Sequence, residues 1–77
     1  MRVETHYGNR VVCGHIFAPE EIKIGSRWQA SSGNTVTVTA NNEGWITYEW
    51  IEKGETRSHE KQSFAFQCRY CLIVEED

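Results

Sequence analysis

Hydrophobic and polar residues alternate along two segments of the chain. Residues 35–39 place two valines on one side of an extended backbone and three threonines on the other, and Ile46, Tyr48 and Trp50 likewise share one side. Successive side chains of a strand point to opposite faces, so this pattern predicts two β-strands with one buried face each. Three further strands are expected, at residues 24–30, 55–62 and 69–74.

Turn residues separate these strands. Gly33, Gly44 and Gly54 each lie in a short polar stretch between two of them. Short strands with turn signals about ten residues apart predict a small all-β barrel or sandwich. The polar strand 55–62 is expected at an edge, where charged side chains discourage unwanted pairing. Residues 63–67 are predicted to form one short 3₁₀ turn that plugs an end of the barrel.

The N-terminal segment is expected to form a β-hairpin or an extended arm. Gly8 and Asn9 suit a two-residue turn, because both tolerate a positive φ. Pro19 and the two glutamates after it suit one helical turn. We therefore expect a single domain over residues 1–77, with the arm at 1–21, the barrel at 22–74 and an acidic tail at 75–77.

The predicted order of elements resembles a known barrel class. Strand, turn, strand, longer hairpin, edge strand, short 3₁₀ turn and closing strand together resemble the five-stranded barrel of the Src-homology-3 (SH3) type. Within that class, three stretches are similar to a group of short phage and prophage proteins of unknown function: Ile24-Gly25-Ser26-Arg27-Trp28, Gly33-Asn34-Thr35-Val36-Thr37-Val38 and Phe66-x-x-Arg69-Tyr70. The similarity covers residues 22–74 and leaves out 1–21. It implies a phage-related origin and a small binding barrel, and it transfers no catalytic residue.

Composition limits the classes of function and location. The 77 residues carry a net charge of −3, which does not favour binding to nucleic acid through bulk charge. No apolar run reaches the roughly 18–20 residues of a membrane-spanning helix, and the N-terminus does not have the pattern of a signal peptide. Three cysteines, an odd number, make a poor disulfide framework. We expect a cytoplasmic protein, in the host cell if it is phage-encoded, with no membrane contact.

Four residues have the types and spacing of a zinc site. Cys13 and His15 share one face of a strand, and Cys68 and Cys71 have CxxC spacing, so together they offer a tetrahedral Cys₃His set. Against zinc, Leu72 comes after the second cysteine of the pair, where zinc knuckles usually have a small residue. The segment around Cys71 is also typical of a buried strand with cysteine as a small apolar residue. The alternatives are buried free thiols, which this pattern favours, and a disulfide between two of the three. No cofactor is therefore expected.

Sequence motifs do not indicate an enzyme. His6, His15 and His59 occur without a nucleophile elbow, a phosphate-binding loop or the HExxH pattern. A histidine on a polar strand is more often an ordinary surface residue than a general base. We expect no catalysis.

A tryptophan and several charged residues suggest a binding surface. By alternation Trp45 faces away from Ile46, Tyr48 and Trp50, so it is the tryptophan expected to be exposed. Exposed aromatic residues are typical anchors of protein interfaces. We expect Trp45 to anchor a protein partner while three acidic residues meet a basic groove on it: Glu43, Glu49 and Glu52.

The sequence therefore predicts a non-enzymatic protein that docks on a host protein complex and inhibits or modulates it. An anti-CRISPR protein or another anti-defence inhibitor is a concrete example. The alternative is an accessory domain that binds single-stranded DNA or RNA through Trp45, Arg57 and Lys61. Glutamates interspersed among these basic groups would weaken any field that attracts phosphate.

Overall fold

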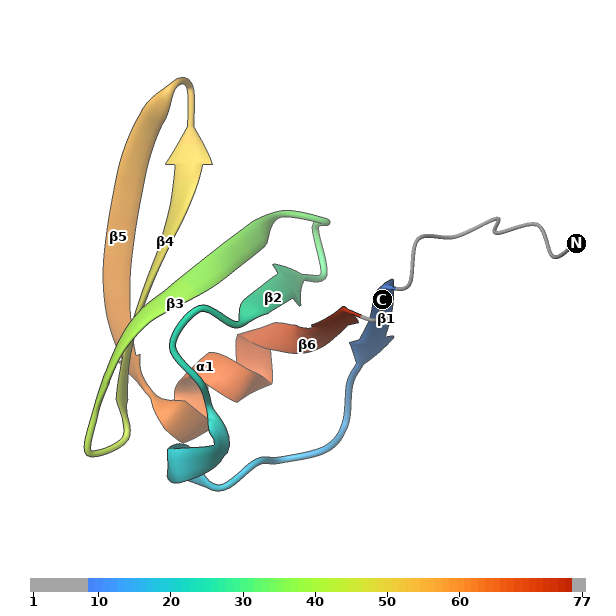
Figure 1. The fold of residues 1–77 in the computed structure, drawn as a ribbon. Helices are drawn as coiled ribbons and strands as arrows, with labels where there is room; N and C mark the ends of the chain where they lie inside the picture. The colour runs from blue at the N-terminus through green and yellow to red at the C-terminus, as the bar shows by residue number, and fades with distance from the viewer. Residues whose placement is uncertain (1–8, 76–77) are drawn as a thin grey trace, which may run out of the picture.

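The computed structural model describes residues 9–75 and shows a mostly antiparallel β-sheet with one helix (Figure 1). Its elements run along the chain in this order: β1 (Asn9–Val12), the 3₁₀ helix η1 (Pro19–Glu21), β2 (Arg27–Ala30), β3 (Thr35–Asn42), β4 (Trp45–Glu52), β5 (Glu55–Gln62), α1 (Ser63–Arg69) and β6 (Tyr70–Glu75). The six described strands form one sheet in the order β1-β6-β2-β3-β4-β5. All five predicted strands are present, and β5 has the predicted bounds and lies at an edge.

The described strands do not close into a barrel, because β1 and β5 remain as free edges of the sheet. The β4–β5 hairpin extends beyond the core and rises away from β2 and β6 (Figure 1). Every side chain of β5 except that of Lys61 is exposed, so nothing draws this strand back over the sheet. The predicted all-β class is therefore correct at the level of an antiparallel sheet.

The N-terminal and C-terminal segments differ in detail from the prediction. The sequence predicts a 3₁₀ turn at residues 63–67, but Ser63–Arg69 forms an α-helix that buries Phe66 and Gln67. The first strand of the expected hairpin, before residue 9, lies outside the described residues. Strand β1 itself pairs with β6, with Val11 opposite Ile73. The helical turn expected at Pro19 is present as η1.

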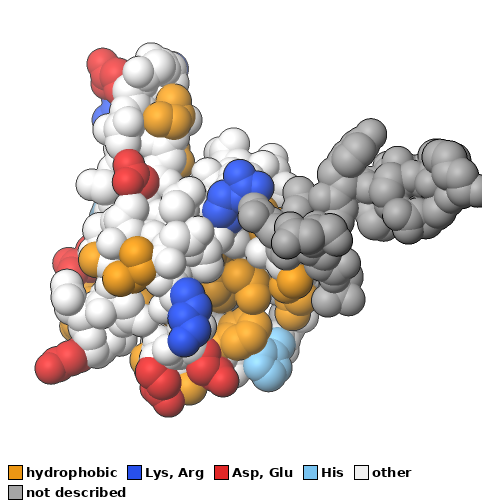
Figure 2. All heavy atoms as spheres, viewed as in Figure 1, with side chains coloured by type: hydrophobic (Ala, Val, Ile, Leu, Met, Phe, Trp, Pro, Cys, Tyr) orange, Lys and Arg blue, Asp and Glu red, His pale blue; other side chains and the backbone are white. Residues whose placement is uncertain are grey.

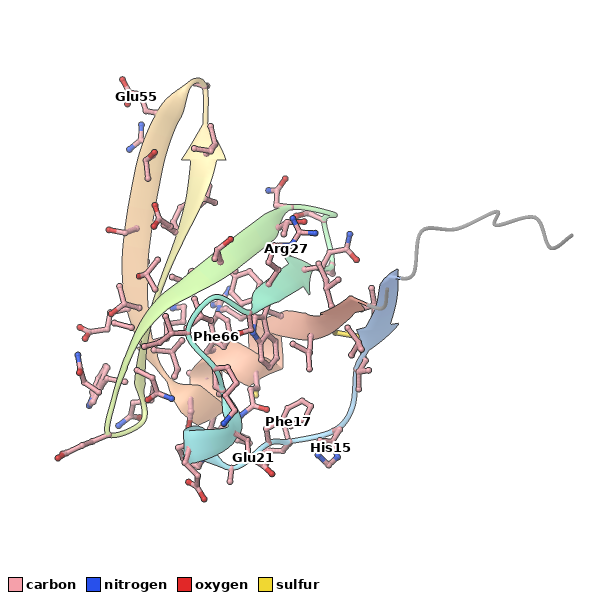
Figure 3. All side chains as sticks on the ribbon, in the orientation of Figure 1. His15, Phe17, Glu21, Arg27, Glu55 and Phe66 are labelled. Carbon is pink, nitrogen blue, oxygen red and sulfur yellow. A yellow bond between two sulfur atoms is a disulfide. The ribbon has the colours of Figure 1, made fainter. Side chains whose placement is uncertain are left out.

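One face of the sheet forms the core together with α1 and η1. Alternation along β3 and β4 buries Val36, Val38, Ile46 and Tyr48, as predicted. The ring of Phe66 lies 5.0 Å from those of both Tyr48 and Trp28, measured between centroids. Figure 3 shows Phe66 directed into this interior, with Phe17 below it in this view. The buried core residues are Ile22, Trp28, Val36, Val38, Ile46, Tyr48 and Phe66, and none of them comes from β5.

Two tight hairpins set the positions of β4 and β5. Lys53 and Gly54 have φ values of 54° and 79°, and Glu43 and Gly44 have values of 53° and 93°. Two successive residues with positive φ form the type I′ turn, whose twist matches that of the flanking strands. These turns therefore fix the register of the hairpins, which pairs Trp45 with Gln62.

The side chain of Gln67 connects α1 to the segment after β1. The backbone N–H of Phe17 donates to Gln67 Oε1 at 2.7 Å, and Gln67 Nε2 donates to the Phe17 carbonyl oxygen at 3.0 Å. The glutamine is only 9% exposed. It therefore satisfies a backbone donor and acceptor that no strand of the described chain pairs.

Replacing Gln67 by leucine is expected to lower the free energy of unfolding by about 1–3 kcal/mol, because it leaves the Phe17 N–H and C=O without partners. Urea unfolding followed by tryptophan fluorescence measures this change. Gln62→Leu, at an exposed position, is the control and is expected to stay within about 0.5 kcal/mol of wild type. Equal effects of the two substitutions would contradict this role for Gln67.

Burial and a side-chain hydrogen bond with Tyr70 raise the pKa of Tyr48 from 10.0 to about 12. Between these values the unfolded chain loses the Tyr48 proton while the folded chain keeps it. The stability that Tyr48 contributes is therefore complete below about pH 10 and is lost as the pH rises towards 12. We therefore expect the free energy of unfolding of Tyr48→Phe, measured in urea, to fall less between pH 10 and pH 12 than that of wild type. Parallel curves of unfolding free energy against pH for the two proteins would contradict this role of Tyr48.

Candidate functional site

Trp45 lies at the start of β4, on the sheet face opposite the core. Its side chain is 45% exposed, whereas Trp28 is buried and Trp50 is partly buried. Its cross-strand neighbours are Asn42 on β3 and Gln62 on β5. Trp45 is thus the most exposed of the three tryptophans, as its position in the alternation predicts.

The other β4 residues on this outer face recur at intervals of two. Thr47 and Glu49 are partly buried, and Glu49 lies between Thr37 and Ser58 on the neighbouring strands. Ile51, at the far end, is 70% exposed. We call Trp45, Thr47, Glu49 and Ile51 the outer β4 row. It places an apolar side chain at each end of a polar middle.

Glu43 is held close to the Trp45 end of this row by the turn that precedes β4. Asn41 fixes that turn, since its Nδ2 donates to the carbonyl oxygens of Pro19 and Ile22, at 2.8 and 3.0 Å. The Gly44 N–H donates to Asn41 Oδ1 at 3.2 Å. A pocket of about 580 Å³ lies between this turn and η1, and Glu43 and Glu20 are among its lining residues. Lys23 also lines this pocket, and Trp45 does not, so the acidic residue nearest Trp45 in the chain is Glu43 in the turn before it.

Glu52 and Arg57 lie at the opposite end of the hairpin. Arg57 Nε is 3.4 Å from Glu52 Oε1, and Arg57 Nη2 is 3.6 Å from Glu55 Oε1. Figure 2 shows acidic and basic side chains adjoining at this tip. From Trp45 to Glu52, β4 spans about 23 Å at roughly 3.3 Å per residue. Glu52 is therefore remote from Trp45, and its charge is shared with Arg57.

The two basic residues of the predicted surface lie on the other side of the sheet from Trp45. Arg57 is opposite Trp50 and Lys61 is opposite Ile46, and both of these β4 residues belong to the core face. Glu43 thus lies in the turn two residues before Trp45, and Glu49 lies on the same sheet face as Trp45. Arg57 and Lys61 are therefore on the opposite sheet face from Trp45, whereas a surface that binds nucleic acid would have the aromatic and basic side chains on one face.

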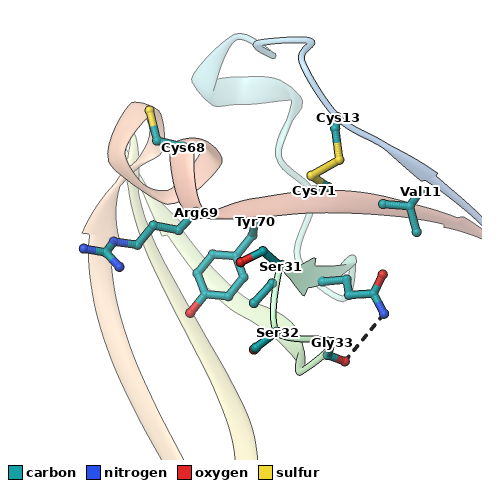
Figure 4. A pocket seen from close by; sticks show the side chains of 11 residues that line it. Val11, Cys13, Ser31, Ser32, Gly33, Cys68, Arg69, Tyr70 and Cys71 are labelled. Atoms are coloured by element: carbon teal, nitrogen blue, oxygen red, sulfur yellow. Dashed lines mark hydrogen bonds between the residues drawn. A yellow bond between two sulfur atoms is a disulfide. The ribbon is translucent and has the colours of Figure 1, made fainter.

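Cys13 and Cys71 form a disulfide with a Cα–Cα distance of 4.9 Å, so the interpretation of buried free thiols is wrong for these two residues. The cysteines face one another because Cys13 continues the β1–β6 register by one pair beyond Val12 and Leu72. Cys68 is free and exposed, and Figure 4 shows its side chain directed away from Cys71.

The predicted zinc ligands are consequently not assembled as a set. Two of the sulfur atoms are joined to each other, and a metal ligand must be a thiolate. His15 instead packs edge-on against Phe17, with ring centroids 4.4 Å apart. Within residues 9–75, no group of three or more His, Cys, Asp or Glu side chains is placed to hold a metal ion.

A pocket of about 730 Å³ surrounds the disulfide and was not predicted from the sequence (Figure 4). It lies between the turn after β2 and the junction of α1 with β6. Its lining residues include Ser31, Ser32, Arg69 and Tyr70. None of the lining residues is His, Asp or Glu, so the recess offers hydrogen-bond donors and one cation but no acid–base pair. The pocket exists only because β1 and β2 both pair with β6, which brings these segments together.

No family model, curated protein or solved structure matches this chain. In the part of the chain that the structure describes, neither helix is long and apolar enough to cross a membrane.

Removing the disulfide is expected to destabilise the fold. The bond closes a loop between residues 58 apart in sequence, and disulfides typically contribute about 2–4 kcal/mol by restricting the unfolded chain. The double variant Cys13→Ser/Cys71→Ser should lose this amount in urea unfolding without reductant.

Cys68→Ser is the matched control, because Cys68 is exposed and unpaired. It should leave stability within about 0.5 kcal/mol of wild type. A wild-type protein with three titratable thiols under oxidising conditions would contradict the pairing.

Proposed function

We propose that this protein is a non-enzymatic binding module that docks on a larger protein complex with the outer face of β4. The observation that carries the proposal is Trp45, 45% exposed on a sheet face with Glu43 beside it and Glu49 further along the strand. A large aromatic side chain with a polar surround is the usual anchor of a protein interface. Trp45 is therefore the central contact.

The acidic neighbours of Trp45 define the chemistry of the partner. Glu43 precedes Trp45 by two residues and lines a pocket together with Glu20 and Lys23, and the whole chain carries a net charge of −3. Such a surface complements a basic groove, and charge complementarity mainly supplies specificity and a faster association rate. A groove that binds nucleic acid on a host complex has this character. An anti-CRISPR or other anti-defence inhibitor encoded by a phage would act in this way.

We propose further that the fold is an opened SH3-like small barrel. The strands β2 to β5 are consecutive neighbours in the sheet, and the last strand, β6, lies beside β2. A short helix precedes that last strand, where the sequence predicts a single helical turn. This order supports the expected class, with the β4–β5 hairpin displaced outward.

The proposed location is the cytoplasm of the host cell. Disulfides are rare in that compartment, because thiol reductants keep cysteines reduced. In this location Cys13 and Cys71 would therefore exist as thiols for part of the protein's lifetime, and docking through Trp45 must not depend on their bond.

Affinity capture from a bacterial host lysate, coupled to mass spectrometry, tests the docking surface. Wild-type protein should retain a protein complex, and Trp45→Ala should weaken binding of that complex at least tenfold, as expected for an interface anchor. Ile16→Ala is the matched control, since Ile16 is an exposed apolar residue after β1 at the other edge of the sheet. Equal retention by Trp45→Ala and wild type would refute the proposal.

The nucleic-acid alternative has a distinct result in the same experiment. Recovery of nucleic acid alone, with binding that weakens steeply with salt and is lost in Arg57→Glu, would replace the protein-docking proposal. The separation of Arg57 and Lys61 from Trp45 by the sheet favours the protein partner.

A further inference from the structure

The outer edge of β5 is unpaired in the described part of the chain. β5 pairs with β4 over its full length without a register shift, and no described strand lies on its other side. Its side chains are exposed on both faces, with Lys61 partly buried. Figure 1 shows this edge on the outside of the hairpin. An uncovered edge of this length exposes a row of backbone donors and acceptors that can pair with another strand.

One hydrogen bond identifies which residues of β5 face this free edge. The Ser63 N–H donates to the Gly44 carbonyl oxygen at 2.7 Å, so residues 44 and 63 form a hydrogen-bonded pair of the antiparallel ladder. Such pairs alternate along a ladder. Odd-numbered residues of β5 therefore bond to β4, and the N–H and C=O groups of Thr56, Ser58 and Glu60 point outward.

A second copy of this chain can pair with that edge in only a few registers. In an antiparallel pair, residues directly opposite each other have side chains on the same sheet face. In a two-fold dimer of identical strands this requires one residue of β5 to lie opposite the same residue of the other copy. Placing Ser58 opposite Ser58 pairs residues 55–61 and puts Glu55 opposite Lys61 twice. Placing His59 opposite itself pairs residues 56–62 and puts Arg57 opposite Lys61, which are like charges. Of these two registers, charge complementarity favours the one centred on Ser58.

We infer that two copies of this protein associate through antiparallel pairing of their β5 edges, with Ser58 at the two-fold axis. Thr56 and Glu60 of opposite copies exchange backbone hydrogen bonds, and the Glu55–Lys61 pairs fix the register. The ion pair between Glu55 and Arg57 within one copy does not prevent this, because it is long, at 3.6 Å, and exposed. This interface is small and polar, so the dimer is a weak one.

Analytical ultracentrifugation over about 10 µM to 1 mM tests the dimer, a range suited to small interfaces. Lys61→Glu and Glu55→Lys each replace two attractive pairs by two repulsive ones, and each should weaken dimerisation roughly threefold to thirtyfold. The double variant Glu55→Lys/Lys61→Glu restores the pairs with reversed sign and should return to within about threefold of wild type.

Two controls reproduce the charge changes outside these pairs. Glu60→Lys matches the charge of Glu55→Lys, but in the inferred register Glu60 lies opposite the uncharged Thr56. Lys23→Glu matches Lys61→Glu at an exposed position remote from the hairpin in the chain. Both should dimerise about as well as wild type. Lys61 is partly buried and the other substituted side chains are exposed, so tryptophan fluorescence is used to check that each variant keeps the fold.

Amide hydrogen exchange gives an independent measurement. Protection at Thr56, Ser58 and Glu60 should rise with protein concentration, while Arg57 and His59 should be protected by β4 at every concentration. A monomer across the whole range, or a dimer that none of the charge variants weakens, would overturn the inference. Trp45→Ala should not change dimerisation, so failure of the docking proposal and failure of this one are separable.

Discussion

Packing of Phe66 against Tyr48 and Trp28 is the interaction on which the rest of the structure depends. Phe66 is the fully buried residue that α1 places on the sheet, and its ring contacts strands far apart in sequence. One short helix and η1 cover one face of the sheet, and they leave the other face and the tip of the β4–β5 hairpin to solvent. A chain of this size buries only roughly 60–65% of the surface of its unfolded form. The exposed outer face and the free edge are consequently the places where this protein can contact another molecule.

The alternation along β3 and β4 made their buried faces predictable, and it also placed Trp45 on the outer face. The polar composition of β5 also predicted an edge strand from local sequence alone. A strand without a buried face does not require apolar residues. Closure of the sheet could not be predicted, since each strand has the same alternation whether the barrel is open or closed. The α-helix at Ser63–Arg69 is longer than the predicted 3₁₀ turn, and its buried Gln67 has a partner, Phe17, that is 50 positions away in sequence.

Features that join distant parts of the chain were beyond the sequence pattern. The Cys13–Cys71 bond and the contact between Gln67 and Phe17 connect residues 58 and 50 positions apart. Both depend on β1 pairing with β6, and local alternation carries no information about which strands are neighbours. Arg57 and Lys61 lie on the opposite sheet face from Trp45 because of the register of the β4–β5 hairpin. The turn at Lys53 and Gly54, both with positive φ, sets that register. Together the disulfide and the glutamine contacts hold the segment after β1 against the end of α1 and the start of β6, at two points that share no residue.

The small contribution of the distal half of the β4–β5 hairpin to the core has an evolutionary consequence. Its distal half contributes no buried core residue, and the ion pairs at its tip are worth little to stability. Substitutions at its exposed positions, such as Ile51 and Thr56, are therefore nearly neutral for folding, whereas Trp50 packs against the core. A lineage under pressure to change its recognition specificity could therefore diversify the sequence of this arm repeatedly while the scaffold beneath it persisted.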